Sequence, residues 1–436
     1  MKFMNSLLLF ALLSCSVAPL IAEDWPHWLG VRGDSTWNDT GLITKFPSSG
    51  PKVLWKAPVA NGYSGPAVSG GMVIVMDYQI ATGALDANPG ARTSLTGKER
   101  VVCLEEKSGK QLWAHSYDCP INLSFPNGPR CTPTIVDGVA FSLGAEGHLS
   151  ALSVADGKVI WEKELKKEYK CDSPIWGYAA SPLVSKGLLY TLAGGAGSAV
   201  VALDVKTGKE VWRSLTTKDI GYAPPVLTER DGKAELIVWH SEALNGLDPA
   251  TGKVRWSQPF TPSYGMSIMA PRVTKDGIFV GAMMKKSMMA KPGDGKAEVV
   301  WEGGANTSLA PKNGTPVVVG DYFYGCDTDG DLRCVKSSTG ERAWSTLEIL
   351  GNKKASSGTF FMVKTPQQWV IFNDGGELIL ADLSPTGYKE ASRAKILSAD
   401  TLSMGRNVVW SHPAFANKCV FARNDKELIC VSLAAE

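Results

Sequence analysis

Three groups of side chains have residue types and spacings that are used in protein chemistry, and the first is an acidic loop. Asp327-Thr-Asp329-Gly-Asp331 places carboxylates at the alternate positions that are typical of calcium-binding loops. An EF-hand also needs Gly at its sixth position and Glu at its twelfth, where this sequence has Leu332 and Ser338. We therefore interpret the segment as a hairpin turn.

The second group is the histidines and the nucleophiles. Histidines 27, 115, 148, 240 and 412 are scattered without the spacing of metal ligands. The sequence has no C-x-x-C, no C-x-x-C-H, no G-x-S-x-G and no phosphate-binding glycine loop. The residues therefore predict no catalytic site and no metal site.

The third group consists of aromatic, cationic and amide side chains, which recur in the stretches between the repeats described below. Binding sites are rich in such residues. Arg130 is the best single candidate, because a guanidinium suits a carboxylate or another anionic group. The alternative is that the tyrosines only fill space beside Gly and Pro. The predicted ligand- or partner-binding residues are Tyr63, Arg130, Trp176, Tyr178, Tyr222, Arg272, Asn313, Arg406, Trp410 and His412, with Tyr264 and Lys312 beside them.

An internal repeat must position these residues. In five segments an aliphatic residue lies five positions before a glycine, and a tryptophan lies four positions after it, as in Leu152, Gly157 and Trp161. Looser copies end at Trp301 and Ala391, and a last-strand copy stands alone at Trp55. Successive tryptophans are 43 to 58 residues apart, which is typical of propeller blades of four strands. We expect these tryptophans to be structural, each packing on its repeat glycine and on the next blade: Trp55, Trp113, Trp161, Trp212, Trp256, Trp301 and Trp344.

Each period also reads as four short strands. In the second blade these are residues 132–136, 139–143, 148–153 and 159–165, separated by Gly138, Glu146-Gly147 and Asp156-Gly157. The C-terminal stretch 411–433 supplies only three strands, and 52–59 is a last strand without a blade. Pairing the two removes exposed sheet edges. The prediction is an all-β, eight-bladed β-propeller of four-stranded antiparallel blades, closed by pairing an N-terminal strand with the C-terminal blade.

The N-terminus predicts export. Residues 1–22 have one lysine and a short apolar run, which is typical of a signal peptide cleaved after Ala22. The alternative is a lipobox ending at Cys15, which would make the chain an outer-membrane lipoprotein. Residues 23–51 then form a lead-in segment, pinned by Trp25, Trp28 and Trp37, and residues 52–436 form the propeller. No later stretch is long and apolar enough to span a membrane.

Composition excludes one class of partner. The 436 residues contain 45 Lys and Arg against 43 Asp and Glu, so the chain has no sustained basic surface. Nucleic acids and anionic membranes need such a surface. We therefore expect no nucleic-acid partner.

The cysteines are consistent with an oxidising compartment, because eight remain beyond Cys15. Cys419 and Cys430 flank Asn424-Asp425 symmetrically, and Cys326 and Cys334 flank the acidic turn in the same way. Directly opposed hairpin residues are close enough for a disulfide, so we predict both bridges. Free buried thiols are the alternative.

The other cysteines allow three connectivities. They are Cys103, Cys119, Cys131 and Cys171. Of the pairs, Cys119 with Cys131 closes the shortest loop, and we predict it with less support than the two hairpin bridges.

The repeat resembles a known family. The pattern Leu-Asp-x-x-Thr-Gly-Lys-x-x-Trp at 203–212 and 247–256 is similar to the repeat of quinoprotein dehydrogenases and of the BamB outer-membrane assembly lipoproteins. Residues 24–30 and 62–66 resemble exported bacterial propellers with pyrroloquinoline-quinone (PQQ) type repeats. The resemblance covers residues 24–433 and implies the fold more than the function.

Two functions follow from this resemblance. The first is a non-catalytic scaffold in the cell envelope, periplasmic or extracellular, that binds an envelope protein, a small molecule or a carbohydrate and needs no cofactor. The second is a PQQ-dependent alcohol or sugar dehydrogenase that uses the quinone with calcium. Many such enzymes have two adjacent cysteines, and some attach a haem through C-x-x-C-H; this sequence has neither. The sequence therefore favours the scaffold.

Overall fold

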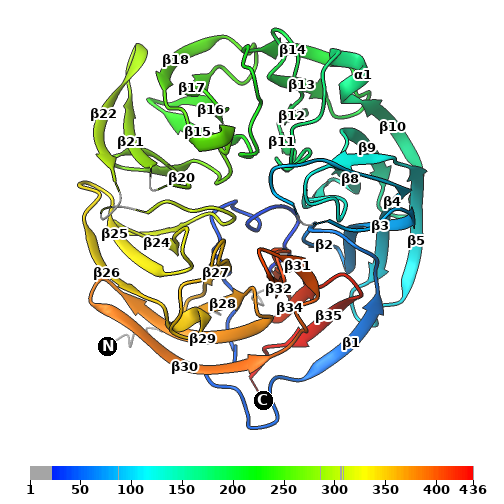
Figure 1. Ribbon diagram of the computed structural model, residues 1–436, viewed down its shortest axis with the longest axis vertical. Helices are drawn as coiled ribbons and strands as arrows, with labels where there is room; N and C mark the ends of the chain where they lie inside the picture. The colour runs from blue at the N-terminus through cyan, green and yellow to red at the C-terminus, as the bar shows by residue number, and fades with distance from the viewer. Residues whose placement is uncertain (1–21, 87, 285, 305–306, 308, 436) are drawn as a thin grey trace, which may run out of the picture.

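Four-stranded antiparallel sheets stand around a common axis in the computed structural model (Figure 1). The structure describes residues 22–86, 88–284, 286–304, 307 and 309–435. The predicted signal peptide up to residue 21, with Cys15, lies outside the described residues. This arrangement is that of a β-propeller, so the predicted all-β fold of four-stranded antiparallel sheets is confirmed.

The strands follow the repeat along the chain. The sheets are formed by β2 (Ala67–Ser69), β3 (Met72–Thr82), β4 (Thr93–Glu105) and β5 (Gln111–Asp118), with β6 (Ile121–Leu123) paired to β4; β7 (Thr134–Val136), β8 (Val139–Leu143), β9 (His148–Ser153) and β10 (Val159–Glu164); β11 (Leu183–Ser185), β12 (Leu188–Leu192), β13 (Val200–Asp204) and β14 (Glu210–Ser214); and β15 (Val226–Arg230), β16 (Lys233–Trp239), β17 (Ala243–Leu247) and β18 (Val254–Pro259).

The later sheets continue in the same order. They are formed by β19 (Arg272–Thr274), β20 (Gly277–Ala282), β21 (Lys286–Pro292) and β22 (Gly295–Gly303); β23 (Val317–Val319), β24 (Tyr322–Cys326), β25 (Leu332–Lys336) and β26 (Arg342–Thr346); β27 (Phe360–Lys364), β28 (Trp369–Asn373), β29 (Glu377–Ser384) and β30 (Gly387–Lys395); and β33 (Ala414–Ala416), β34 (Cys419–Arg423), β35 (Glu427–Ser432) and β1 (Val53–Pro58). Outside them lie the hairpin β31 (Thr401–Ser403) and β32 (Arg406–Val408), the helix α1 (Leu165–Tyr169) and 3₁₀ turns at Ser263–Gly265 and Glu348–Leu350. Among the described residues no helix is long and apolar enough to cross a membrane.

The two ends of the chain share one sheet. β1 pairs antiparallel with β35, with Trp55 opposite Cys430 and Pro58 opposite Glu427. The strand at residues 53–58 therefore completes a sheet whose other three strands come from the last repeat.

The repeat tryptophans join neighbouring sheets. The ring of Trp113 lies against Gly157 of the following repeat, and its Nε1 donates a hydrogen bond to the carbonyl of Val154, 2.8 Å away. The same pair of contacts recurs at Trp55, Trp161, Trp212 and Trp301. The predicted contact with the next blade is present, but the predicted contact with the repeat's own glycine is wrong. Each of these tryptophans lies on the outer strand of its own sheet, and its ring reaches the turn that precedes the outer strand of the next sheet.

One junction departs from this pattern. Trp256 packs on Gly246 of its own sheet, and its buried Nε1 has no partner among the described residues. The next repeat has a shorter turn, and there β18 pairs in parallel with β22, with Trp256 opposite Gly295. Backbone hydrogen bonds therefore link these two sheets in place of the indole contact.

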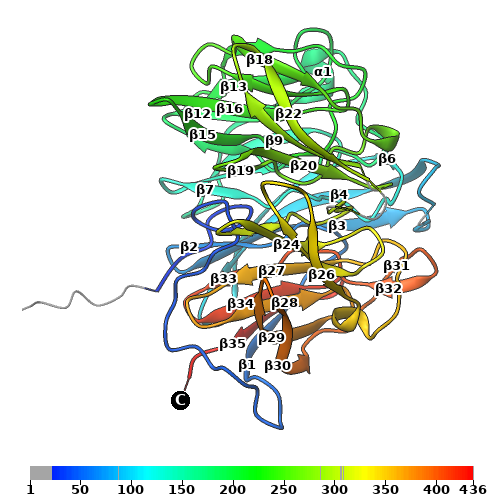
Figure 2. The same ribbon diagram turned by 90° about the vertical axis from the view of Figure 1, so that its left-hand side faces the viewer.

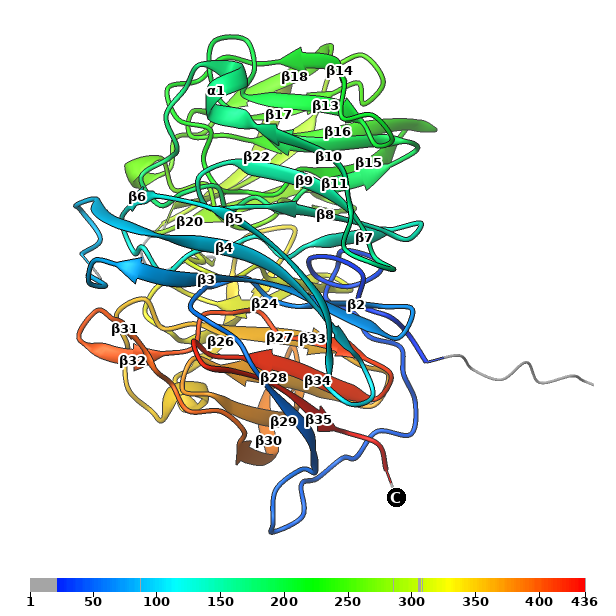
Figure 3. The same ribbon diagram turned by 90° about the vertical axis from the view of Figure 1, so that its right-hand side faces the viewer.

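The lead-in segment crosses one face of the propeller. Trp25 and Trp37 are fully buried, and both rings contact Phe415 of β33. The Trp25 amide pairs with Val68, and the Trp37 amide donates to the carbonyl of Lys364. Figures 2 and 3 place this blue segment on the face opposite β6 and the β31–β32 hairpin. The prediction that tryptophans pin this segment is confirmed for these two.

The register corrects one predicted disulfide. All described cysteines are free thiols. In the β24–β25 hairpin Cys326 lies opposite Leu332, and Cys334 lies opposite Tyr324. The thiol of Cys326 points to the carbonyl of Gly358, 3.2 Å away. Cys326 and Cys334 are therefore not directly opposed as predicted, and the Cys326 thiol is directed away from Cys334 towards Gly358.

The other two predicted pairings have different outcomes. Cys119 packs with Tyr78 and its neighbours, whereas the thiol of Cys131 faces the carbonyl of Tyr178, so the structure does not bring this pair together. Cys419 and Cys430 lie diagonally across β34 and β35, and their thiols share a hydrogen bond. The bridge between this last pair stays a prediction.

Candidate functional site

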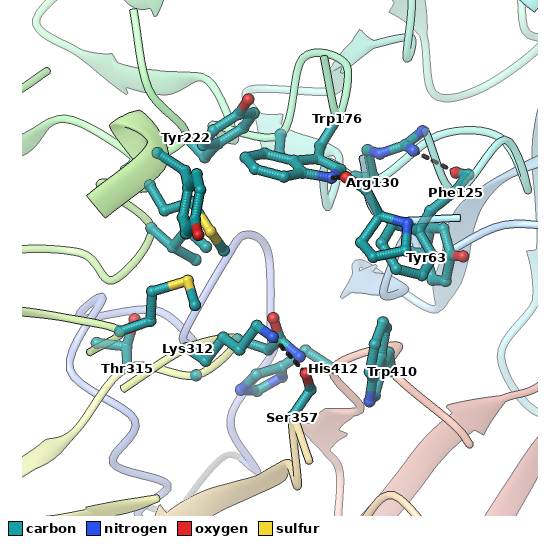
Figure 4. Close-up of a pocket in the computed structure, with 18 of the residues that line it drawn as sticks. Tyr63, Phe125, Arg130, Trp176, Tyr222, Lys312, Thr315, Ser357, Trp410 and His412 are labelled. Carbon is teal, nitrogen blue, oxygen red and sulfur yellow. Dashed lines mark hydrogen bonds between the residues drawn. The ribbon is translucent and has the colours of Figure 1, made fainter. Parts of the chain in front are cut away.

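The segments between the sheets converge on one cavity near the axis. Its volume is about 810 Å³, and it is drawn in Figure 4. The lining residues come from nearly every sheet junction: Trp28, Tyr63, Pro89, Gly90, Phe125, Arg130, Ile175, Trp176, Ala179, Tyr222, Pro224, Tyr264, Met266, Ile268, Met283, Lys312, Asn313, Gly314, Thr315, Ser357, Phe361, Met404, Trp410 and His412.

Most of the predicted binding residues lie at this cavity. Seven of the ten line it: Tyr63, Arg130, Trp176, Tyr222, Asn313, Trp410 and His412. They are far apart in the chain, and each belongs to a segment that leads from the outer strand of one sheet to the inner strand of the next. The repeat thus brings them to one place.

Three predicted residues lie elsewhere. The ring of Tyr178 covers Gly147, and its hydroxyl donates to the carbonyl of Ala193 at 2.8 Å. Arg272 on β19 donates through Nη2 to the carbonyl of Gly33 at 2.9 Å, beneath the lead-in segment. Arg406 donates to the carboxylate of Asp374 at 2.6 Å. None of the three is among the described lining residues, since each is engaged in packing or pairing within the protein, although Arg406 also donates to the carbonyl of the lining residue Ser357.

Aromatic rings form much of the wall. The centroids of Trp176 and Tyr222 lie 5.5 Å apart, and Trp410 lies 5.9 Å from Phe125 and 6.3 Å from Tyr63. Tilted and edge contacts at these distances hold the rings in fixed orientations. The cavity therefore presents rigid apolar faces.

Arg130 is the first of two cations at the cavity. Its Nη atoms donate to the backbone carbonyls of Ser124, Phe125 and Gly128, and its guanidinium lies 5.4 Å from the centre of the Tyr63 ring. Burial lowers the pKa of Arg130. Among the described residues no carboxylate forms an ion pair with it. The guanidinium thus shapes the 124–128 loop and leaves a positive charge beside the cavity.

Lys312 is the second cation. Its Nζ donates to the hydroxyl of Ser357, as the dashed line in Figure 4 shows. Burial lowers the pKa of this amine. In the described part of the chain no carboxylate pairs with Lys312 either. Neither cationic lining residue therefore forms an ion pair with a carboxylate of the described residues, although Glu99 and Glu146 lie within electrostatic reach of Arg130.

The floor of the cavity was missed by sequence reasoning. Trp28 belongs to the lead-in segment, and its ring meets that of His412 edge to face, with centroids 4.8 Å apart. Figure 4 shows the faint blue loop of this segment behind the labelled side chains. The sequence offered the aromatic at position 28, but nothing in the repeat indicated that the lead-in crosses the axis.

His412 is neutral where it lies. It is buried between Trp28 and Phe361, and its Nδ1 lies near the carbonyl of Pro413. Burial lowers the pKa of His412 to about 4. A neutral imidazole in this position serves as part of the wall.

The donor set does not fit calcium. The described lining residues include neither Asp nor Glu, whereas Ca²⁺ is bound by six to eight oxygens, with carboxylates prominent among them. The cavity instead offers buried donors without partners among the described residues: Trp28 Nε1, Trp410 Nε1 and the Tyr222 hydroxyl. Donors and cations suit a ligand that accepts hydrogen bonds and carries negative charge.

The fold and this cavity define a propeller built from PQQ-type repeats around an axial pocket. A family model described as outer membrane protein assembly factor BamB matches residues 97–346, and the chain belongs to this family. The BamB of Shewanella oneidensis is 23% identical over 255 residues, which are 54% of this chain and 61% of that protein. The match therefore spans about three fifths of that relative's length.

Other comparisons agree on the repeat and the fold. Quinohemoprotein alcohol dehydrogenase ADH-IIG of Pseudomonas putida is 28% identical over 193 residues, 40% of this chain and 26% of the enzyme. The crystal structure of BamB from Moraxella catarrhalis superposes with a TM-score of 0.54 at 16% identity, covering 81% of this chain and 99% of that one. This likeness concerns the fold alone.

Proposed function

We propose that this protein is an exported, non-catalytic scaffold of the cell envelope that binds a segment of a partner protein in the axial cavity. The observation that carries the proposal is the cavity itself, with aromatic walls and with Arg130 and Lys312 hydrogen-bonded to carbonyl and hydroxyl oxygens and in no ion pair with a carboxylate of the described residues. The cavity fits a segment with an apolar side chain and an anionic group.

The scaffold that holds this cavity is a closed ring of eight blades. The pairing of β1 with β35 and the eight successive groups of four strands support this count. Closure completes the last blade, because β1 supplies the fourth strand and covers the edge of β35.

The partner belongs to the assembly of outer-membrane proteins. The support is that the relatives from Shewanella oneidensis and Vibrio cholerae are named outer membrane protein assembly factors. A mature chain that starts at Glu23, or one anchored by a lipid at Cys15, would place the propeller on the side of the envelope where such assembly occurs.

Site-specific photo-crosslinking in the producing cells tests this proposal. The probe is a photoreactive amino acid at Tyr264, a lining residue that is 73% exposed and so tolerates replacement. The control is the same probe at Val211, which is 52% exposed on β14. We expect an outer-membrane protein or a component of its assembly to cross-link from position 264 only. Equal products from both positions, or none from 264, would reject the cavity as the binding site.

The second candidate is a quinone-dependent dehydrogenase, because matches to quinoprotein alcohol dehydrogenases cover about two fifths of the chain. Aromatic faces and Arg130 suit a planar anionic quinone, but the lining supplies no carboxylate for calcium or for a base. Absorption spectra and a dye-linked alcohol oxidation assay, each with and without added quinone and calcium, decide this question. Stoichiometric quinone binding with turnover would replace the scaffold by the enzyme.

A further inference from the structure

Two histidines and a glutamate meet at the rim of the propeller, away from the cavity. His115 lies on β5, His148 on β9 and Glu162 on β10, so the group joins two neighbouring sheets (Figure 1). Sequence spacing hid this group, because metal-ligand patterns within one segment do not describe residues that meet across a sheet interface.

The atoms are close enough to share one ion. Nε2 of His115 lies 2.9 Å from Oε1 of Glu162, and Nε2 of His148 lies 3.2 Å from the same oxygen. One ligand atom from each residue lies within 4.8 Å of the other two. Ligands of a tetrahedral zinc ion, with bonds near 2.1 Å, are about 3.4 Å apart. The two contacts to Oε1 of Glu162 thus lie within about 0.5 Å of the spacing in a zinc site.

The environment of His148 favours a ligand role. Its Nε2 is buried and makes no hydrogen bond within the described residues, although Glu162 lies near. Its ring stacks on Tyr117 with centroids 3.9 Å apart, and the Tyr117 hydroxyl donates to Oε2 of the buried Glu99 at 2.6 Å. Stacking on Tyr117 therefore holds the His148 ring with Nε2 near the Glu162 carboxylate.

We propose that His115, His148 and Glu162 bind one divalent transition-metal ion of the zinc class. Two imidazole nitrogens and one carboxylate oxygen are borderline ligands that suit Zn²⁺ and exclude a preference for Ca²⁺ or Mg²⁺. Three protein ligands leave a fourth position for water. Glu162, whose side chain is 33% exposed, puts that position at the surface, so the ion links sheet β2–β5 to sheet β7–β10 and remains open to solvent.

Titration of the chelator-treated protein tests the site. The probes are Zn²⁺ by calorimetry and Co²⁺ by its visible absorption, with thermal melting before and after chelator. We expect one equivalent to bind, a visible Co²⁺ band of four-coordinate type, and a melting temperature that rises with zinc and falls back with chelator. Ca²⁺ at the same concentration should produce none of these changes.

Matched variants separate this site from adventitious binding. His115→Gln, His148→Gln and the more conservative Glu162→Gln should each weaken binding at least ~10-fold, whereas His240→Gln, in the turn between β16 and β17, should bind as the wild type does. Glu162→Gln is the variant that should fold normally, because the glutamate side chain is partly exposed and glutamine has nearly the same shape. The proposal is overturned if the wild type binds no Zn²⁺ below millimolar concentration, or if Glu162→Gln and His115→Gln bind with unchanged affinity.

Discussion

The ring of Trp113 covers Gly157 of the next sheet so closely that a β-carbon on this glycine would lie 2.6 Å from ring atom Cε3. The indole N–H also donates to the carbonyl of Val154, three residues earlier in the same turn. One residue pair therefore ties the outer strand of one sheet to the turn of another, and its recurrence along the chain is what packs the sheets together.

Gly157→Ala should destabilise the protein by packing as well as by backbone strain. Gly138 is the matched control, because it has a similar φ of 75° against 71° but no atom within 4 Å of its missing β-carbon. We expect Gly138→Ala to cost about 1–2 kcal/mol from the left-handed backbone, and Gly157→Ala to cost a further ~1–3 kcal/mol from displacement of the indole. Denaturant unfolding measures both, and equal losses would mean that the tryptophan contact adds nothing.

Removal of residues 52–59 should open the ring. The deletion leaves β35 with an unpaired edge and removes Trp55, whose Nε1 donates to the carbonyl of Glu106 at 2.7 Å. We expect a much lower melting temperature and aggregation, because exposed edges pair with other chains. Light scattering and thermal melting measure this. Leu54→Ala, at a position that is 46% exposed on the same strand, is the control and should change stability by no more than about 0.5 kcal/mol. A monomeric deletion variant with unchanged melting would rule out the closed ring.

Lys312→Met should weaken partner binding without unfolding the chain. This amine makes one hydrogen bond, to Ser357, and the variant removes its charge while keeping most of its volume. We expect at least ~10-fold weaker binding of an anionic segment, since charge-assisted hydrogen bonds to buried cations contribute about 1.5–3 kcal/mol. Affinity of the cross-linked partner, measured by calorimetry, checks this. Unchanged affinity would place the anionic group of the partner elsewhere.

Arg130→Ala should have a mixed effect. Arg130 lines the cavity, and it also donates to three backbone carbonyls of the 124–128 loop. The truncation should cost about 1–3 kcal/mol of stability as well as binding. Arg130→Lys keeps the positive charge but not the several N–H donors of the guanidinium. This variant should therefore keep a larger share of the binding affinity than of the free energy of unfolding. If Arg130→Ala has the same melting temperature as the wild type, the 124–128 loop does not depend on this side chain.

Protonation of His412 in the unfolded chain should lower the free energy of unfolding of the protein as the pH drops below 6.5. Its pKa is 6.5 in the unfolded chain and about 4 in the folded protein, so the unfolded chain binds the proton first. The contribution of His412 to the free energy of unfolding is fully present above pH 6.5 and declines as the pH falls towards 4. It amounts to about 3 kcal/mol. Across this window the unfolding free energy of the wild type should fall by about 3 kcal/mol more than that of His412→Phe. Parallel pH curves would show that the imidazole does not titrate on unfolding.

Cys419 and Cys430 should form a disulfide under oxidation, whereas Cys326 and Cys334 should not. The thiols of the first pair share a hydrogen bond, and this bond to Cys430 lowers the pKa of Cys419, which favours the reactive thiolate. In the second pair the thiol of Cys326 instead points to the carbonyl of Gly358, 3.2 Å away. Mild oxidation followed by alkylation and peptide mapping tests both statements. Alkylated Cys419 in the oxidised protein, or a recovered 326–334 bridge, would contradict them.

The repeat made the sheets predictable. A glycine at each turn and a tryptophan four positions later are local signals, since left-handed turns and strand alternation depend on neighbouring residues. The strands predicted at 139–143 and 148–153 are those observed as β8 and β9. The segments between repeats were predictable as binding candidates for a related reason: they depart from the pattern that packing imposes.

Tertiary structure decided which side chains meet. Whether Trp113 covers Gly109 or Gly157, whether Cys326 faces Cys334, and whether Trp28 reaches the axis depend on register and on the angle between sheets, which one-dimensional spacing does not encode. The same holds for His115 and His148, which lie 33 residues apart in the chain and share Glu162 only because two sheets pack side by side. Thus the sequence by itself determined the repeating all-β architecture and the segments at its axis, because these follow from local periodicity. The cavity and the rim site were decided only by the packing of distant strands, because contacts between sheets depend on three-dimensional geometry.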